Sequence, residues 1–215
     1  MEEQKKENRE IENNNIEEPQ NVSEVIFTET LDEKFKRELK EFEDNGFKFS
    51  DNNRVFDLGS PSQILIDTGI PDLPVVVLQS TITKAIGMGK GKKDSDHELK
   101  LSDLVNLPEC VQNPILILES NSASSKPGGR VLYTEIKNFR GETAIVAVHI
   151  NLKLPGRIKV NIIPSIHTRN NFKLGELIVI AEANGQVLYV NNGKIKSWLK
   201  RVGQLQLLPK LLSQP

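Results

Sequence analysis

Apolar positions are almost absent from the first part of the chain and then return at helical spacing. Residues 1–22 consist mainly of Glu, Asn, Gln and Lys. Such a segment buries too little apolar surface to offset the entropy lost on ordering, so we predict a disordered acidic tail. In residues 23–54, which we interpret as a linker, an apolar stripe predicts an amphipathic helix that ends near Asn45 and Gly46. The stripe consists of Leu31, Phe35, Leu39 and Phe42. This helix could pack on the following domain or connect it to something upstream.

Residues 55–201 show short helical patterns followed by a series of strand patterns, and we interpret them as one domain. A β-branched run at residues 75–78 predicts a buried strand. Four later segments joined by short loops predict an antiparallel meander. These segments are residues 115–119, 130–138, 143–151 and 157–166. The remaining predicted elements are helices at 60–69, 80–86, 103–107, 172–183 and 193–201, a helical turn between Pro108 and Pro114, a last strand at 186–190 and an apolar tail at 202–215. This order predicts an α+β domain with a four-stranded antiparallel sheet and helices packed on one face.

The cysteine and histidine content argues against disulfides and metal sites. The single cysteine, Cys110, cannot form an internal disulfide, and we interpret it as a small buried hydrophobe. The three histidines are far apart and no HxxxH or CxxC spacing is present, so we expect no metal ligands and no cofactor. No apolar run approaches the roughly 20 residues of a membrane helix, and the first residues do not match a secretory signal. We therefore expect a cytoplasmic protein without a membrane partner.

Charge is divided unevenly along the chain. Residues 1–55 contain 16 acidic and 9 basic side chains, a net charge of −7, whereas residues 56–215 contain 13 acidic and 19 basic side chains, a net charge of +6. A basic domain behind an acidic extension is compatible with a polyanionic substrate, although ordinary surface variation would give the same numbers. The Gly- and Lys-rich residues 87–96 do not match a P-loop, because no Ser or Thr follows the lysine. This loop is either a solvated segment or a source of phosphate attraction near a substrate groove.

Strand alternation predicts one polar, basic face on the sheet. In the last of the four segments, the pattern assigns one set of residues to the core and another to the polar side, with Ile163 as the exception. The core set is Ile158, Val160, Ile162, Pro164 and Ile166, and the polar set is Arg157, Lys159, Asn161, Ser165 and His167. Alternation also gives Tyr133, Glu135 and Lys137 a common face, and it puts His149 on one face of the neighbouring segment. These groups supply the proton transfer and the cations that metal-free RNA cleavage requires.

Each of these residues also has a purely structural interpretation. His149 is flanked by apolar neighbours and fits a half-buried strand position. Glu135 could simply pair with Lys137 or Arg140 across the sheet. His97 and Arg169 could be ordinary surface residues. A serine hydrolase is not supported, because the sequence has no GxSxG motif.

A series of short motifs runs through residues 55–200 in a distinctive order. They are Phe56-Asp57-Leu58-Gly59-Ser60-Pro61-Ser62, Gly69-Ile70, Leu73-Pro74, His97, Asn106-Leu107-Pro108, Asn113-Pro114-Ile115, Thr134-Glu135-Ile136, Ser165-Ile166-His167 and Val187-Leu188-Tyr189-Val190. This series resembles the phage barnase/EndoU/colicin/RelE-like nuclease domains, which occur at the carboxyl termini of phage Mu-type head-morphogenesis proteins and mobile-element polyproteins. The chain departs from the family at Asp96, where a basic residue is common, and in the greater length of residues 87–96.

The resemblance implies a barnase/EndoU/RelE-like α+β fold and a metal-independent endoribonuclease that cleaves RNA by transphosphorylation, deployed as a toxin or effector of a phage or mobile element. It implies that His97 is a general acid or base and that Glu135, Ser165 and His167 line the site, so Glu135 or His167 would be the second proton-transfer group. We expect phosphate and substrate binding by Lys137, Ser165, Thr168 and Arg169. A toxin of this kind could have an immunity or inhibitor protein as a partner. The alternative hypothesis is a catalytically silent nucleic-acid- or protein-binding module on the same fold.

Overall fold

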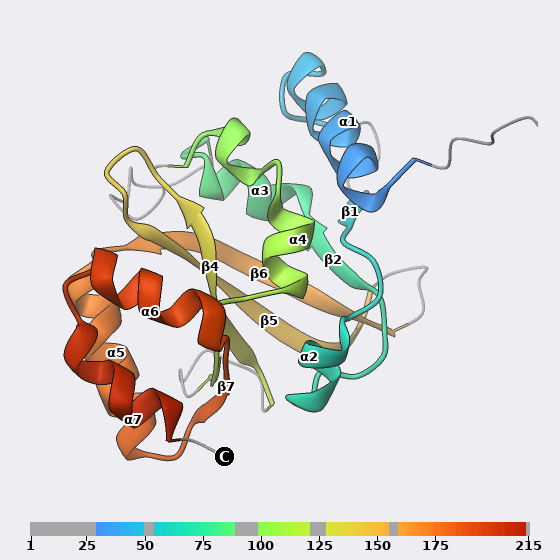
Figure 1. Ribbon diagram of the computed structural model, residues 1–215. Helices are drawn as coiled ribbons and strands as arrows, with labels where there is room; N and C mark the ends of the chain where they lie inside the picture. The colour runs from blue at the N-terminus through green and yellow to red at the C-terminus, as the bar shows by residue number, and fades with distance from the viewer. Residues whose placement is uncertain (1–28, 50–53, 89–98, 121–127, 155–158, 214–215) are drawn as a thin grey trace, which may run out of the picture.

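A seven-stranded mixed sheet forms the centre of the computed structural model, which describes residues 29–49, 54–88, 99–120, 128–154 and 159–213. The strand order is β1-β2-β6-β5-β4-β3-β7 (Figure 1). The strands are β1 (Val55–Asp57), β2 (Val75–Leu78), β3 (Leu116–Glu119), β4 (Arg130–Lys137), β5 (Thr143–Lys153), β6 (Lys159–Arg169) and β7 (Val187–Val190). The predicted α+β class is confirmed by this mixture of a central sheet and packed helices.

The prediction of four antiparallel strands is wrong in number and in orientation. The four expected segments do form an antiparallel meander from β3 to β6, but three further strands extend it. At one edge, β7 pairs with β3. At the other, β2 pairs with β6 in parallel, and β1 pairs with the outer side of β2. The parallel pair joins Val75 to Asn161 and Val77 to Ile163. These partners are more than 80 residues apart in the sequence, so the local pattern at residues 75–78 predicts a strand but not its neighbour in the sheet.

Helices cover both faces of the sheet, so the prediction of helices on one face is also wrong. One face, called the α4 face below, carries Leu132 and Val146 into a core with the earlier helices. The other, called the α5 face, carries Tyr133 and Ile145 into a core with the last three helices, which Figure 1 shows grouped together. The helices are α1 (Leu31–Asp44), α2 (Gln63–Asp67), α3 (Gln79–Ala85), α4 (Leu107–Gln112), α5 (Asn171–Ala183), α6 (Asn192–Arg201) and α7 (Leu208–Leu212), with 3-10 turns at Leu101–Leu104 and Leu205–Leu207. Among the described residues, no helix has both the length and the apolar character needed to cross a membrane.

The amphipathic helix α1 is part of the main core. Thr30 caps its first turn through a reciprocal capping box with Glu33. The apolar stripe predicted from the sequence is buried, with Phe35 and Phe42 at 0% exposure and Leu39 at 2%. Of the two arrangements that the sequence left open, packing of this helix on the domain is the one observed.

The predicted alternation of β6 fails at Pro164. On β5, Ala147 pairs with Ser165 but His149 pairs with Ile162, so β6 gains a residue relative to β5 between these two pairs. Such a bulge exchanges the two faces of a strand, and proline favours it because proline lacks a backbone N–H for the ladder. As a result, Ile162 and Ile166 belong to different hydrophobic clusters instead of one common face.

Candidate functional site

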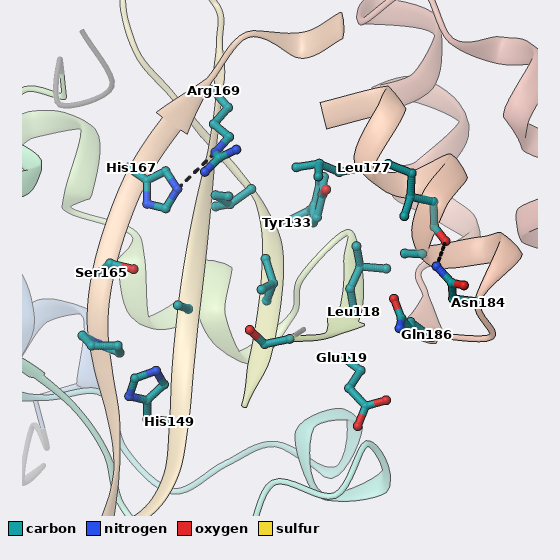
Figure 2. Close-up of a pocket in the computed structure, with 17 residues that line it drawn as sticks. Leu118, Glu119, Tyr133, His149, Ser165, His167, Arg169, Leu177, Asn184 and Gln186 are labelled. Atoms are coloured by element: carbon teal, nitrogen blue, oxygen red, sulfur yellow. Dashed lines mark hydrogen bonds between the residues drawn. The ribbon is translucent and has the colours of Figure 1, made fainter. Parts of the chain in front are cut away.

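A cavity of about 640 Å³ opens between the α5 face of the sheet and helix α5 (Figure 2). Its lining comes from the sequence between β3 and β7. The lining residues are Leu118, Glu119, Ser120, Val131, Tyr133, Ile145, Ala147, His149, Pro164, Ser165, His167, Arg169, Leu177, Ile180, Ala181, Asn184 and Gln186. A cavity of this volume falls within the range of small-molecule sites.

Three predicted site residues line this pocket from one strand. Ser165, His167 and Arg169 alternate along β6 beyond the bulge, so their side chains share the α5 face. The guanidinium Nε of Arg169 donates a hydrogen bond to Nε2 of His167 at 3.3 Å. A nitrogen that accepts this bond carries no proton, so the contact fits the imidazole tautomer with its proton on Nδ1. The pair therefore combines a proton acceptor with a permanent cation.

The second histidine of the pocket, His149, comes from β5. His167 pairs with Ile145, which precedes His149 by four residues on the same strand. At the usual rise per strand residue, the two histidines are about 13 Å apart along the sheet. Figure 2 shows the two histidines well separated along the strands, with Ser165 between them. An extended ligand could contact both imidazoles, whereas a single small anion could not.

The middle of the pocket is apolar. Tyr133 and Leu118 are buried in the sheet, at 1% and 6% exposure, and Leu177 and Ile180 of α5 remain 37% and 56% exposed. The Tyr133 ring packs edge-on against Trp198 with ring centroids 5.7 Å apart. Burial raises the pKa of Tyr133 above its usual range, so its phenol stays neutral. The neutral phenol and the aliphatic side chains form a wall against which a flat or apolar group could pack.

Glu135, one of the predicted catalytic residues, does not line this pocket. Its carboxylate forms an ion pair with Nζ of Lys194 on α6 at 2.6 Å. Lys194 also donates to the backbone carbonyl of Asn113 at 2.8 Å, which ties the pair to the end of α4. Lys137 lies in the same region, because its charge interacts with those of Glu135 and Arg201. The structure thus separates the predicted polar residues of β4 from those of β6.

Of two other predicted residues, one is buried away from the pocket and the other lies outside the described residues. Thr168 is fully buried, and its hydroxyl accepts a hydrogen bond from Nδ2 of Asn138 at 3.3 Å. His97 lies outside the described residues.

Sequence reasoning missed the α5 side of the pocket and the basic residue Arg201. Leu177 and Ile180 were assigned only to a helix, although that helix is apolar around most of its circumference, as its exposed Phe172 and Val179 show. An apolar exterior of this kind is a signal that part of a helix borders a site. The sequence did not single out Arg201, because its position beside β4 depends on how α6 packs on the sheet.

Cys110 behaves as the small apolar residue that the sequence predicted. It packs against the core of the α4 face, and burial raises the pKa of its thiol to about 11. Within the described part of the chain, no group of three or more His, Cys, Asp or Glu side chains could hold a metal ion.

Fold and pocket together define an α+β domain with a histidine- and arginine-containing cavity on one sheet face. The family model described as Phage MuF-C-terminal domain matches residues 89–197, just over half of the 215 residues. The chain therefore belongs to the phage MuF C-terminal domain family. No curated protein matches the chain. No solved structure matches it either.

The matched segment contains the whole pocket. It covers β3 to β7, which are contiguous in the sheet, and every lining residue of the cavity. The elements α1, β1, α2, β2 and α3 precede it. The family match confirms the phage association that the sequence resemblance implied.

Proposed function

We propose that this domain is a metal-independent endoribonuclease of a phage or mobile element and that the pocket beneath α5 is its active site. The proposal rests mainly on one observation: at one end of the cavity, Nε2 of His167 accepts a hydrogen bond from Arg169 beside the Ser165 hydroxyl. A proton acceptor, a fixed cation and a hydroxyl donor are the groups that phosphodiester transfer needs. The apolar wall beside them offers a surface for a nucleobase.

In the proposed reaction, the RNA 2′-oxygen attacks the adjacent phosphorus and the bond from phosphorus to the 5′-oxygen breaks. His167 takes the proton from the 2′-hydroxyl through Nε2, once the phosphate replaces that nitrogen as the partner of Arg169. The guanidinium of Arg169 and the Ser165 hydroxyl stabilise the charge that develops on the phosphate. The products are a 2′,3′-cyclic phosphate and a free 5′-hydroxyl.

The leaving 5′-oxygen must gain a proton from a second group. His149 lies about 13 Å from His167 along the sheet, too far to act on the same phosphate, so His97, outside the described residues, is the histidine that remains for this role. Glu135 is a weaker choice than the sequence implied, because its carboxylate is engaged by Lys194.

The test compares alanine variants of the three histidines in a cleavage assay with total RNA in the presence of EDTA. His167→Ala should lower the cleavage rate at least a hundredfold, as expected for loss of a general acid or base. His97→Ala should show a comparable loss, and His149→Ala, which removes a histidine from the far end of the same pocket, is the matched control. Full activity of His167→Ala would overturn the assignment of the site.

The alternative, a catalytically silent binding module, is supported by the largely apolar lining of the cavity. RNA binding by the wild-type domain without any cleavage, with or without EDTA, would favour that function over the nuclease.

A further inference from the structure

A second basic cluster lies beside the pocket, where α6 crosses the end of β4. We call it the α6 cluster, and it consists of Glu135, Lys137, Lys194 and Arg201. Lys194 and Arg201 are seven residues apart on the helix, so they point to the same side, and Lys194 contacts Glu135 directly. Figure 1 shows α6 lying across the sheet near β4. Two strand residues and two helix residues are therefore brought together by this crossing.

The α6 cluster has an excess of positive charge. The carboxylate of Glu135 is matched by Lys194 at 2.6 Å, which leaves two more cations. In the part of the chain that the structure describes, the side chains of Lys137 and Arg201 have no hydrogen bond and no ion pair. Burial and the neighbouring charge of Arg201 lower the pKa of Lys137, and burial lowers that of Arg201. Two like charges held together in a partly buried position are stabilised when an anion binds between them.

Lys137 of the α6 cluster lies in register with Arg169, the cation of the pocket. Lys137 pairs with Thr143 on β5, and Thr143 pairs with Arg169 on β6, so the three residues form one row across three strands. At the usual spacing of neighbouring strands, Lys137 and Arg169 are about 10 Å apart. Thr143 between them accepts a hydrogen bond from Nε1 of Trp198 at 2.9 Å, which fixes α6 over the row.

We propose that Lys137 and Arg201 bind a backbone phosphate of the same strand whose scissile phosphate lies at Arg169. The identity of this strand as RNA rests on the proposed function. The row then places a second phosphate site beside the pocket, where it orients a single-stranded substrate relative to Arg169. Phosphate contacts of this kind position the backbone and do not select a base.

The experiment measures binding of a short single-stranded oligoribonucleotide, made resistant to cleavage by 2′-O-methylation, over a series of salt concentrations. Each phosphate contact contributes about 0.7 to the slope of log K against log salt for single strands. Lys137→Gln and Arg201→Gln should each weaken binding and reduce the slope by about that amount. Lys196→Gln is the matched control, because it removes the same charge from the exposed side of α6. Binding of a mononucleotide, which cannot span the row, should not change in any variant.

The outcomes separate this proposal from the proposed function. An effect of Lys196→Gln equal to that of Lys137→Gln would overturn the proposal, because net charge alone would explain it. Unchanged slopes in both cluster variants would overturn it as well. Lys137→Arg keeps the charge and should restore the slope, which distinguishes a lost contact from a damaged fold. If the wild type binds with the expected slope but cleaves no RNA, the phosphate site stands and the nuclease function fails.

Discussion

Helix α1 lies before the segment that matches the MuF C-terminal domain family, yet its removal from the core should unfold the whole domain. Phe42 is the most informative position, because its side chain is fully buried. Its ring contacts three others, with centroids 5.8 Å from Phe47, 4.9 Å from Phe49 and 5.4 Å from Phe56. Phe56 belongs to β1, so these contacts connect the helix to the edge of the sheet.

The expected cost of Phe42→Ala follows from this environment. Replacing a buried phenylalanine by alanine typically costs about 3–5 kcal/mol. Aromatic pairs contribute about 0.5–1.5 kcal/mol each beyond burial, so three ring contacts favour the upper part of that range. A domain is usually stable by only about 5–15 kcal/mol. The variant should therefore lose a large fraction of its total stability and melt roughly 10 °C lower or more.

Urea denaturation monitored by Trp198 emission measures this effect. Trp198 is the only tryptophan in the chain and is buried in the other core, on the α5 face, so a shift in its transition reports cooperative unfolding of both faces. Lys36→Ala, an exposed position on the same helix, is the control and should unfold like the wild type. A urea midpoint of Phe42→Ala close to that of Lys36→Ala would refute this reasoning and show that α1 contributes little to the stability of the domain.

Two further predictions concern the residues around α6. Thr143→Val removes the acceptor of the Trp198 indole N–H and should lower the free energy of unfolding by about 1–3 kcal/mol, since the buried donor is left unsatisfied; an unchanged urea midpoint would contradict this. Glu135→Gln breaks the ion pair with Lys194, in which the Glu135 side chain is 53% exposed, so stability should change by less than about 1 kcal/mol. The same variant should retain RNA cleavage near the wild-type rate, and a loss of about a hundredfold would instead restore Glu135 as a proton-transfer group.

Local patterns predicted the elements of this fold much better than their arrangement. The meander from β3 to β6 followed from alternation and tight turns, and the β-branched run at residues 75–78 was predicted as a strand. That run contains no signal that its partner is the stretch Asn161–Ile163, because parallel pairing is set by long-range packing. Similarly, an amphipathic helix shows that it has a buried side but not which face of the sheet receives it.

The prediction of the candidate site was correct where strand alternation was regular and failed where it was not. Ser165, His167 and Arg169 follow the bulge on β6 and share one face, as alternation requires. The bulge at Pro164 moved Ile162 out of the set that the pattern had assigned to one core. A bulge is a property of two strands in register, so a single strand's sequence gave no means to count it.

Glu135 shows why a shared strand face is insufficient evidence for a shared site. It has the same parity as Tyr133, which lines the pocket, but the pairing of β4 with β5 shifts register between Tyr133 and Lys137. The shift adds an even number of residues to β4, so Ile136 still joins the core that contains Leu132, but Glu135 lies beyond the residues that line the pocket. Moreover, β3 pairs with β4 only as far as Tyr133, and α6 provides Lys194 next to the carboxylate. A carboxylate held by a lysine at 2.6 Å must lose a charge-assisted partner before it can accept a proton from a substrate, whereas the 3.3 Å bond to His167 is released when Arg169 binds the phosphate instead. The difference between these two exchanges is the physical reason to assign proton abstraction to His167.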